Sequence, residues 1–285
     1  MKTYRWLLRR ELWENRAIWL IPVVIAVALV FAALFGRVDV MEDVPSRTFG
    51  GMLLLLVGIL YFLVFGVYSS WYLLDCLYSD RRDKSVLFWK SLPISDSATV
   101  LSKLAMALLV IPVVYFVVSD VSVLLTAFIV SVRAHSILGG ALWSPDLWLQ
   151  LQVLWIYLIV VSAIWFLPLA GYLLLISASA RRAVMLWSIL PPLALGLIER
   201  WFFGTHVIFR EVSVRLAGFP AVAFRPDPNA PWTGGGEDLG RALPSVWNMI
   251  DLQGFFSSPQ TLVGVAVGAG LIFCAIQVRS RRAEI

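Results

Sequence analysis

Charged side chains are scarce in this sequence. They make up 14% of its 285 residues, against roughly 25% in soluble domains, while 60% of the residues are hydrophobic. This composition excludes a soluble globular protein. The net charge of +5 does not indicate a nucleic-acid partner, because the basic residues are sorted between apolar runs in a way that membrane topology explains.

Residues suited to catalysis or metal binding are also few. A phosphate loop needs Gly directly before its Lys, and no lysine has that neighbour, so the chain cannot supply a standard ATPase site. The two histidines, His135 and His206, belong to no His-Glu-x-x-His helix, and no Gly-x-Ser-x-Gly elbow occurs. Cys76 and Cys274 form no disulfide or metal pattern and are expected to be packed free thiols. We assign no catalytic, cofactor-binding or metal-binding residue.

Apolar runs of membrane-spanning length dominate the chain. A bilayer core of about 30 Å needs roughly 20 apolar residues in a helix, because every backbone polar group must be satisfied internally. Six runs approach or meet that length: 18–35, 52–74, 100–121, 149–176, 184–198 and 262–278. The sequence therefore predicts an all-α integral membrane protein with six transmembrane helices. The first run follows sixteen residues of mixed charge, longer than a usual signal-peptide n-region, and we expect it to be a retained anchor.

Basic residues fall mainly in alternate gaps. With the N-terminus inside, the internal segments hold fifteen of the 23 Lys and Arg residues, and five of the remaining eight lie in the long external segment 200–256. The positive-inside rule has little force on so long a segment. We expect a multi-pass protein of the cell inner (cytoplasmic) membrane with both termini in the cytosol.

The stretch 2–16 is too polar to span but has helical periodicity. Tyr4, Leu8 and Leu12 form one ridge, and arginines converge on an adjacent face. This pattern predicts an interfacial helix over 1–16, with Trp6 and Trp13 as anchors at the headgroup level.

A charged segment, 75–99, follows the second run. Its first half carries both signs of charge, and its middle contains the apolar Phe88 and Trp89. Pro93 disfavours helix at Leu92, and Ser95 or Asp96 can cap the next helix.

The loop that closes as Ser91-Leu92-Pro93-Ile94-Ser95, followed by Ser102-Lys103, resembles that of the permease (transmembrane) subunits of type-2 ABC exporters. The resemblance covers most of the chain, from the amphipathic N-terminal helix to the long external segment. It implies one transmembrane permease domain over 1–285, whose segment 75–99 is a coupling loop for a separate ATPase. The coupling residues would be Arg81, Arg82, Asp83, Lys84, Phe88, Trp89 and Lys90.

The resemblance also implies partners. ATP and Mg would bind the partner ATPase, present in two copies, and a second permease copy or a paralogue would complete the pathway within the lipid. In that family the external segment, here 200–257, holds short re-entrant helices that close the outer side. Trp247, Ile250, Phe255 and Phe256 make this stretch apolar without reaching spanning length, so they form a possible external gate.

Two runs are unusual. The third continues to about residue 132, roughly 48 Å of helix, so Asp120 is expected near the outer interface with 121–132 protruding or interfacial. The fifth contains Pro191-Pro192, and we expect a broken or kinked helix there.

Two other classes of function stay open. A membrane-embedded lipid-modifying enzyme would use Asp120, Glu199 and His206, and a non-transporting sensor or immunity partner would need no such residues. The predominance of apolar residues in the spans favours an amphipathic or hydrophobic cargo over a small ion.

Overall fold

The computed structural model of the chain describes residues 2–36, 46–82, 95–133, 143, 145–225 and 249–282. This part of the chain is helical, with no strand among the described residues beyond an isolated bridge between Phe224 and Ile250. Six helices in it are long and apolar enough to cross a membrane, which confirms the predicted all-α membrane architecture.

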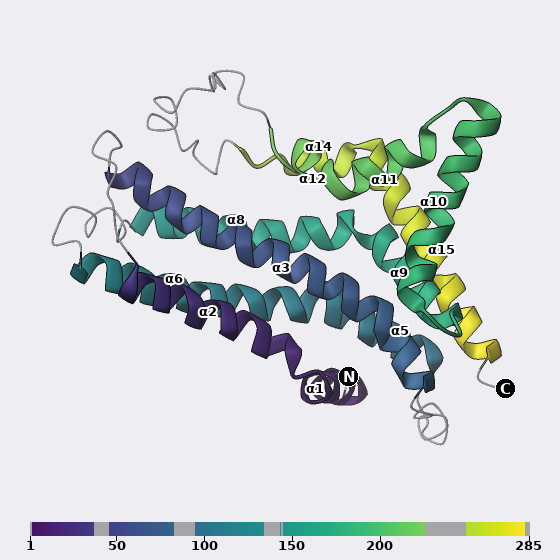
Figure 1. Cartoon of the computed structure of the whole chain (residues 1–285), viewed down its shortest axis with the longest axis horizontal. Helices are drawn as coiled ribbons and strands as arrows, with labels where there is room; N and C mark the ends of the chain where they lie inside the picture. The colour runs from purple at the N-terminus through teal and green to yellow at the C-terminus, as the bar shows by residue number, and fades with distance from the viewer. Residues whose placement is uncertain are drawn as a thin grey trace.

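The spans are built from the following helices: α2 (Ala17–Phe35), α3 (Ser46–Arg82), α5 (Asp96–Ala105) with a π-helical segment (Met106–Val110) and α6 (Ile111–Arg133), α8 (Pro145–Trp165), α10 (Val184–Phe203) and α15 (Pro259–Arg282). Shorter helices are α1 (Lys2–Glu14), α9 (Leu167–Ser179), α11 (Val207–Ala217), α12 (Phe219–Ala223) and α14 (Leu252–Ser257). In Figure 1, α2, α3, α6 and α8 run side by side, and α10 and α15 cross the right-hand end of this group.

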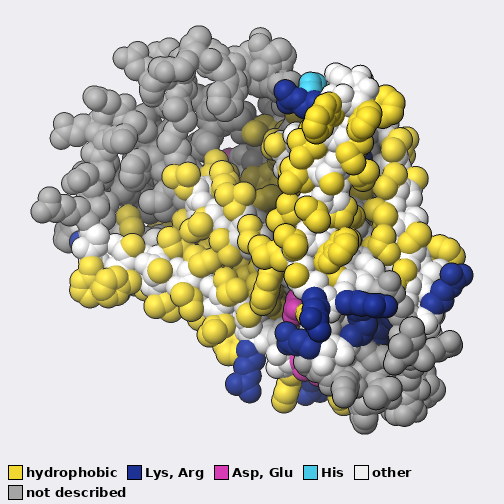
Figure 2. Space-filling model, turned by 45° about the vertical axis from the view of Figure 1, so that its right-hand side comes forward, with side chains coloured by type: hydrophobic (Ala, Val, Ile, Leu, Met, Phe, Trp, Pro, Cys, Tyr) yellow, Lys and Arg dark blue, Asp and Glu magenta, His cyan; other side chains and the backbone are white. Residues whose placement is uncertain are grey.

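The main hydrophobic core lies between α3 and the helices packed on it. Tyr61, Met106, Tyr115 and Leu174 are fully buried there. Outside this core the spans expose large apolar side chains, and α10 is the least buried of the six. Figure 2 shows apolar side chains over the middle of one face and Lys and Arg gathered mainly toward its lower end. Lipid is the environment that such a surface requires.

The fourth span contains a bend that the sequence reading did not predict. The single run expected over 149–176 is divided into α8 and α9 at Phe166, whose φ of −86° and ψ of 4° leave the helical region. Pro168 follows in the first turn of α9, where its missing N–H is tolerated. The bend sends α9 against α15 and α3 instead of along α8 (Figure 1).

Close packing of α9 on α15 depends on two glycines. A Cβ placed on Gly171 would lie 2.9 Å from the Gly268 carbonyl oxygen, and one on Gly268 would lie 2.9 Å from the Leu167 carbonyl carbon. Small residues at such a crossing let two backbones approach within the membrane.

The break expected at Pro191-Pro192 is wrong, since α10 continues through both prolines. Each proline leaves the carbonyl four residues earlier, at Trp187 and Ser188, without its helical donor. The Tyr172 hydroxyl of α9 donates to these two carbonyls, at 3.4 Å and 2.9 Å. A neighbouring helix therefore compensates for the tandem proline.

The third span continues as a helix to Arg133, and its last part packs against α2. The Arg133 guanidinium donates to the carbonyls of Ala33 and Gly36, where α2 ends. Residues 121–132 thus pair with the first span, and Asp120 accepts a hydrogen bond from Gln152 at 3.0 Å.

Candidate functional site

A cluster of buried charges joins four helices at one end of the bundle. We call the side chains of Glu11, Asp80, Asp96, Lys103 and Arg279 the charge cluster; they come from α1, α3, α5, α5 and α15 respectively. Glu11 and Lys103 are each 3% exposed, and Asp80 and Arg279 are each 8% exposed. Charged residues this deeply buried are rare unless they are paired.

The pairing is continuous across the cluster. Lys103 Nζ lies 3.0 Å from Glu11 Oε1 and 3.3 Å from Asp80 Oδ2. Arg279 then continues the chain of ion pairs, with its terminal nitrogen 3.4 Å from Asp80 Oδ2 and its Nε 3.1 Å from Asp96 Oδ1. Each cation is thus shared by two carboxylates from different helices, and four helix ends are linked by one electrostatic network.

Glu11 is also held by neutral donors. The Tyr72 hydroxyl of α3 donates to Glu11 Oε2 at 2.7 Å, and the Asn15 amide donates to the same oxygen at 3.3 Å. These bonds satisfy the oxygen that Lys103 does not reach, which a carboxylate removed from water requires.

Local sequence explains how each side chain reaches the cluster. The buried positions Leu7 and Glu11 are four residues apart on α1, so they share the face that meets the bundle. Ser95 begins α5 as its N-cap, with its side chain accepting from the Ala98 N–H, as the sequence predicted. Asp96 then occupies the first turn, where the helix dipole favours an acid, and Lys103 follows two turns later. The π-helical segment comes directly after α5, and Ser69 of α3 donates to its Ala107 carbonyl.

The cluster flanks the segment 83–94, which lies outside the described residues. Asp80 precedes this segment and Asp96 follows it, and the single side chain of Arg279 binds both. Arg81 anchors the same end of α3 to α9 by donating to the carbonyls of Ser177 and Ala180. The two ends of the predicted coupling loop are therefore fastened to the third and sixth spans.

Most of the predicted coupling residues fall in that segment. Arg81 and Arg82 form the last turn of α3, with Arg81 half-buried and Arg82 exposed. Asp83, Lys84, Phe88, Trp89 and Lys90 lie outside the described residues, so their role stays a prediction.

The predicted interfacial helix forms α1, and it lies across the direction of α2 (Figure 1). Trp6 and Trp13 are exposed, and the Arg9 guanidinium lies over both rings at 5.7 Å and 5.6 Å. The opposite face, with Leu7 and Glu11, packs on the bundle. This arrangement suits a helix with its aromatic residues at the headgroup level.

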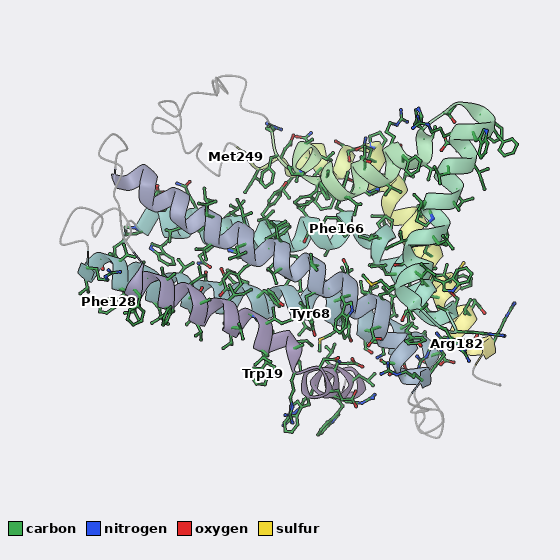
Figure 3. All side chains as sticks on the ribbon, in the orientation of Figure 1. Trp19, Tyr68, Phe128, Phe166, Arg182 and Met249 are labelled. Carbon is green, nitrogen blue, oxygen red and sulfur yellow. The ribbon has the colours of Figure 1, made fainter. Side chains whose placement is uncertain are left out.

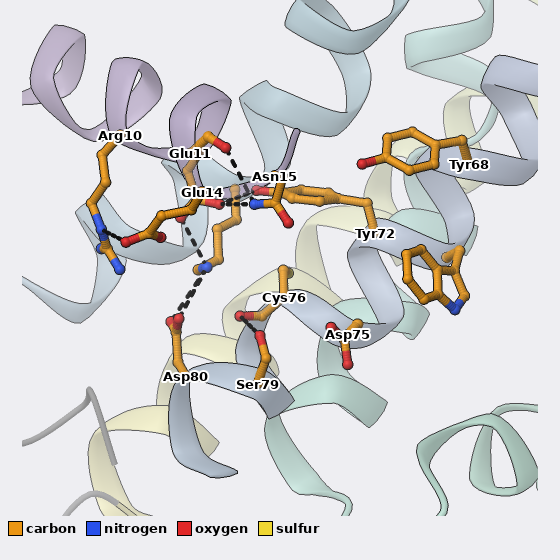
Figure 4. A pocket seen from close by; sticks show the side chains of 12 residues that line it. Arg10, Glu11, Glu14, Asn15, Tyr68, Tyr72, Asp75, Cys76, Ser79 and Asp80 are labelled. Atoms are coloured by element: carbon orange, nitrogen blue, oxygen red, sulfur yellow. Dashed lines mark hydrogen bonds and ion pairs between the residues drawn. The ribbon is translucent and has the colours of Figure 1, made fainter. Parts of the chain in front are cut away.

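A cavity of about 340 Å³ lies between α1 and α3, beside the charge cluster. Figure 4 shows residues from both helices around it, including Arg10, Glu14 and Asn15 of α1 and Tyr68 and Asp75 of α3. Its volume is within the range of small-ligand pockets, roughly 300–1,000 Å³.

The external segment forms short helices that pack on α8. Tyr157 and Trp165 of α8, Phe219 of α12 and Phe255 of α14 make a second buried core. Trp165 Nε1 donates to the Arg215 carbonyl at 3.0 Å, and the Arg215 guanidinium lies 4.6 Å from the Trp165 ring. Burial lowers the pKa of Arg215.

Three of the four predicted gate residues lie in or beside this core. Phe255 is fully buried, Ile250 is half-buried and Phe256 is exposed, whereas Trp247 lies outside the described residues. Arg225 binds Asp251 at 2.9 Å, and its hydrogen bond, together with that of the Gly254 N–H, holds the pKa of Asp251 below its usual range. The stretch is thus tied down, and gating stays a prediction.

The residues named for an enzyme have separate partners. Asp120 is bound by Gln152, and Glu199 accepts from the N–H groups of Val207 and Ile208, capping α11. His206 is exposed at the start of that helix, and His135 lies outside the described residues. Within the described ranges no group of three His, Cys, Asp or Glu side chains could hold a metal ion. Both cysteines are free; Cys76 is buried, but Cys274 is exposed on α15, so the expectation that both are packed is wrong for Cys274.

Sequence reasoning missed the charge cluster as a site. Lys103 and Arg279 entered only the topology count, and Glu11 received no role. The available signal was an ionisable residue at the edge of an apolar run, which is a functional-site hypothesis by default. Periodicity could indicate which face of α1 carries Glu11, but not which distant cation it would meet.

Comparison with protein families, with curated proteins and with solved structures finds no match for this chain.

Proposed function

We propose that this chain is the membrane-spanning subunit of an ATP-driven exporter of the type-2 ABC class, forming half of a translocation pathway and coupled to a separate ATPase subunit. The support is the six-span helical architecture, the amphipathic α1 and the short helices between the fifth and sixth spans. No lysine of the sequence follows a glycine, so hydrolysis of ATP falls to a partner.

The observation that carries the proposal is the attachment of both ends of the segment 83–94 to one arginine. Arg279 of α15 binds Asp80 before the segment and Asp96 after it, and Lys103 extends this network to α1 through Glu11. A force applied to the loop by a partner would reach the third span, the sixth span and the interfacial helix together. Buried ion pairs suit this role, because their geometry is strongly directional and costly to break.

The partners follow from the same proposal. Two ATPase copies would carry ATP and Mg, and a second permease copy or a paralogue would supply the other half of the pathway. In this arrangement the end with the charge cluster faces the cytosol of the inner membrane, and both termini lie on that side.

Affinity purification of the tagged chain from membranes of its source tests the partner. We expect an ATPase subunit with a phosphate loop to co-purify in stoichiometric amount. Replacing Phe88 and Trp89 together by Ala should reduce its recovery at least tenfold, because two large apolar side chains that become buried against a partner contribute roughly 1.5–3 kcal/mol each. Recovery of the chain with no ATPase, at wild-type expression, would contradict the proposal.

Transmission is tested separately from binding. Arg279→Gln should leave the ATPase bound but uncouple its activity from the permease, measured as loss of the change in ATP hydrolysis that the permease causes. Arg281→Gln is the matched control, since Arg281 lies on the same helix but is exposed. Equal coupling in both variants would remove the charge cluster from the mechanism.

A further inference from the structure

The cavity between α1 and α3 has features that the proposed function does not use. It opens to the surface beside Trp71, which is 56% exposed, and beside the half-exposed Glu14. Its inner wall is made by the charge cluster residues Glu11, Asp80 and Lys103. It therefore connects the outer surface of α3 with a buried network of charges.

One carboxylate of the cavity is without a cation. Glu14 is paired with Arg10 at 2.6 Å, and Glu11 and Asp80 are paired with Lys103. Asp75 also lines the cavity, but it has no ion pair or hydrogen bond with any residue that the structure describes. The lining thus offers a negative charge to a ligand.

Aromatic residues stand beside this carboxylate. Tyr68 and Trp71 both line the cavity, with their ring centroids 6.3 Å apart. Tyr68 is only 5% exposed, and Figure 4 shows its hydroxyl directed into the cavity, where none of the described residues binds it. Aromatic faces together with a carboxylate are the usual means of recognising an ammonium group.

An apolar ridge leads into the cavity along α3. Ile59, Leu63, Val67 and Trp71 are exposed and occur at intervals of four residues, so they lie in one row on the helix surface. Asp75 and Ser79 continue the same row into the cavity. A ligand that follows this row has an apolar tail and a cationic head.

We propose that this cavity binds the ammonium headgroup of a membrane phospholipid such as phosphatidylethanolamine, with the acyl chain lying along the ridge from Ile59 to Trp71. Asp75 accepts from the ammonium, Tyr68 and Trp71 enclose it, and Arg10 at the same cavity is available for the lipid phosphate. The site goes beyond the proposed transport function. A lipid bound there contacts α1, α3 and the charge cluster at once.

Native mass spectrometry of the purified full chain tests this site. The chain is exchanged into micelles with equal amounts of phosphatidylethanolamine and phosphatidylglycerol of matched acyl chains. We expect the ethanolamine lipid to be retained about tenfold over the glycerol lipid, and Asp75→Asn or Trp71→Ala to abolish that preference. Glu211→Gln and Trp187→Ala, which alter exposed residues away from the cavity, should keep it.

Two further measurements make the result decisive. Asp75→Glu should restore most of the preference, which a folding defect in Asp75→Asn would not allow, and the thermal unfolding of each variant is compared with the wild type. Free phosphoethanolamine in excess should not displace the lipid, because it lacks the acyl chain. Displacement by the free headgroup would overturn the lipid assignment, and an unchanged preference in Asp75→Asn would overturn the site. The assay contains no ATPase, so its outcome is independent of the proposed transport function.

Discussion

Removing Lys103 should unfold the end of the bundle where α1, α3, α5 and α15 meet. Its ammonium is 3% exposed and lies within 3.3 Å of two carboxylates, Glu11 and Asp80. Lys103→Met keeps the length and apolar stem but leaves Glu11 buried with only neutral donors. Breaking a buried pair in this way costs about 3–5 kcal/mol of unfolding free energy.

A second substitution separates this explanation from a general packing defect. Glu11→Gln removes the negative charge but keeps an oxygen that can accept from Tyr72 and Asn15. In the double variant no uncompensated charge remains on α1, so the two substitutions together should cost less than the sum of the single ones. Coupling energies between contacting residues are about 0.5–3 kcal/mol, and we expect a value in the upper half of that range.

The assay is unfolding of the purified chain in mixed micelles, followed by circular dichroism. Glu14→Gln is the control, because the Arg10–Glu14 pair is on the same helix but its carboxylate is half-exposed, and such pairs contribute about 0.3–0.5 kcal/mol. A loss below about 1 kcal/mol for Lys103→Met, or strictly additive costs in the double variant, would refute the argument.

Two other predictions concern the packing of the spans. Gly268→Leu should destabilise the chain by at least about 1–3 kcal/mol, since its side chain would meet the Leu167 backbone, whereas Gly270→Leu on the same helix has open space and should be nearly neutral; similar melting temperatures of the two variants would contradict this. Tyr172→Phe should cost about 1–3 kcal/mol, because the carbonyls of Trp187 and Ser188 lose the hydroxyl that replaces their helical donors. A wild-type melting temperature for Tyr172→Phe would show that α10 tolerates its tandem proline unaided.

Energetic effects in the two regions differ in kind. The glycine contact between α9 and α15 is limited by steric exclusion, and so only size matters at Gly268. The charge cluster is limited by desolvation, and so the charge state of its neighbours matters more than their volume. This difference is why the cluster, and not the glycine contact, can respond to a partner or a lipid.

The amino-acid sequence by itself determined the class of the protein and the places of its spans. Twenty-residue apolar runs can satisfy their backbone in lipid only as helices, so hydropathy and length sufficed for the six helices and for α1. The N-cap at Ser95 was also predictable, because capping is a local interaction between residues three apart.

Tertiary structure alone decided which distant residues meet. Arg279 reaches Asp80 across 199 positions of sequence, and Lys103 reaches Glu11 across 92, distances over which no periodicity carries information. The bend at Phe166 and the unbroken α10 have the same origin: Pro168 and Pro191-Pro192 weaken a helix equally well on local grounds. Whether the helix bends or continues depends on a neighbour such as Tyr172, whose position is a property of the packed bundle.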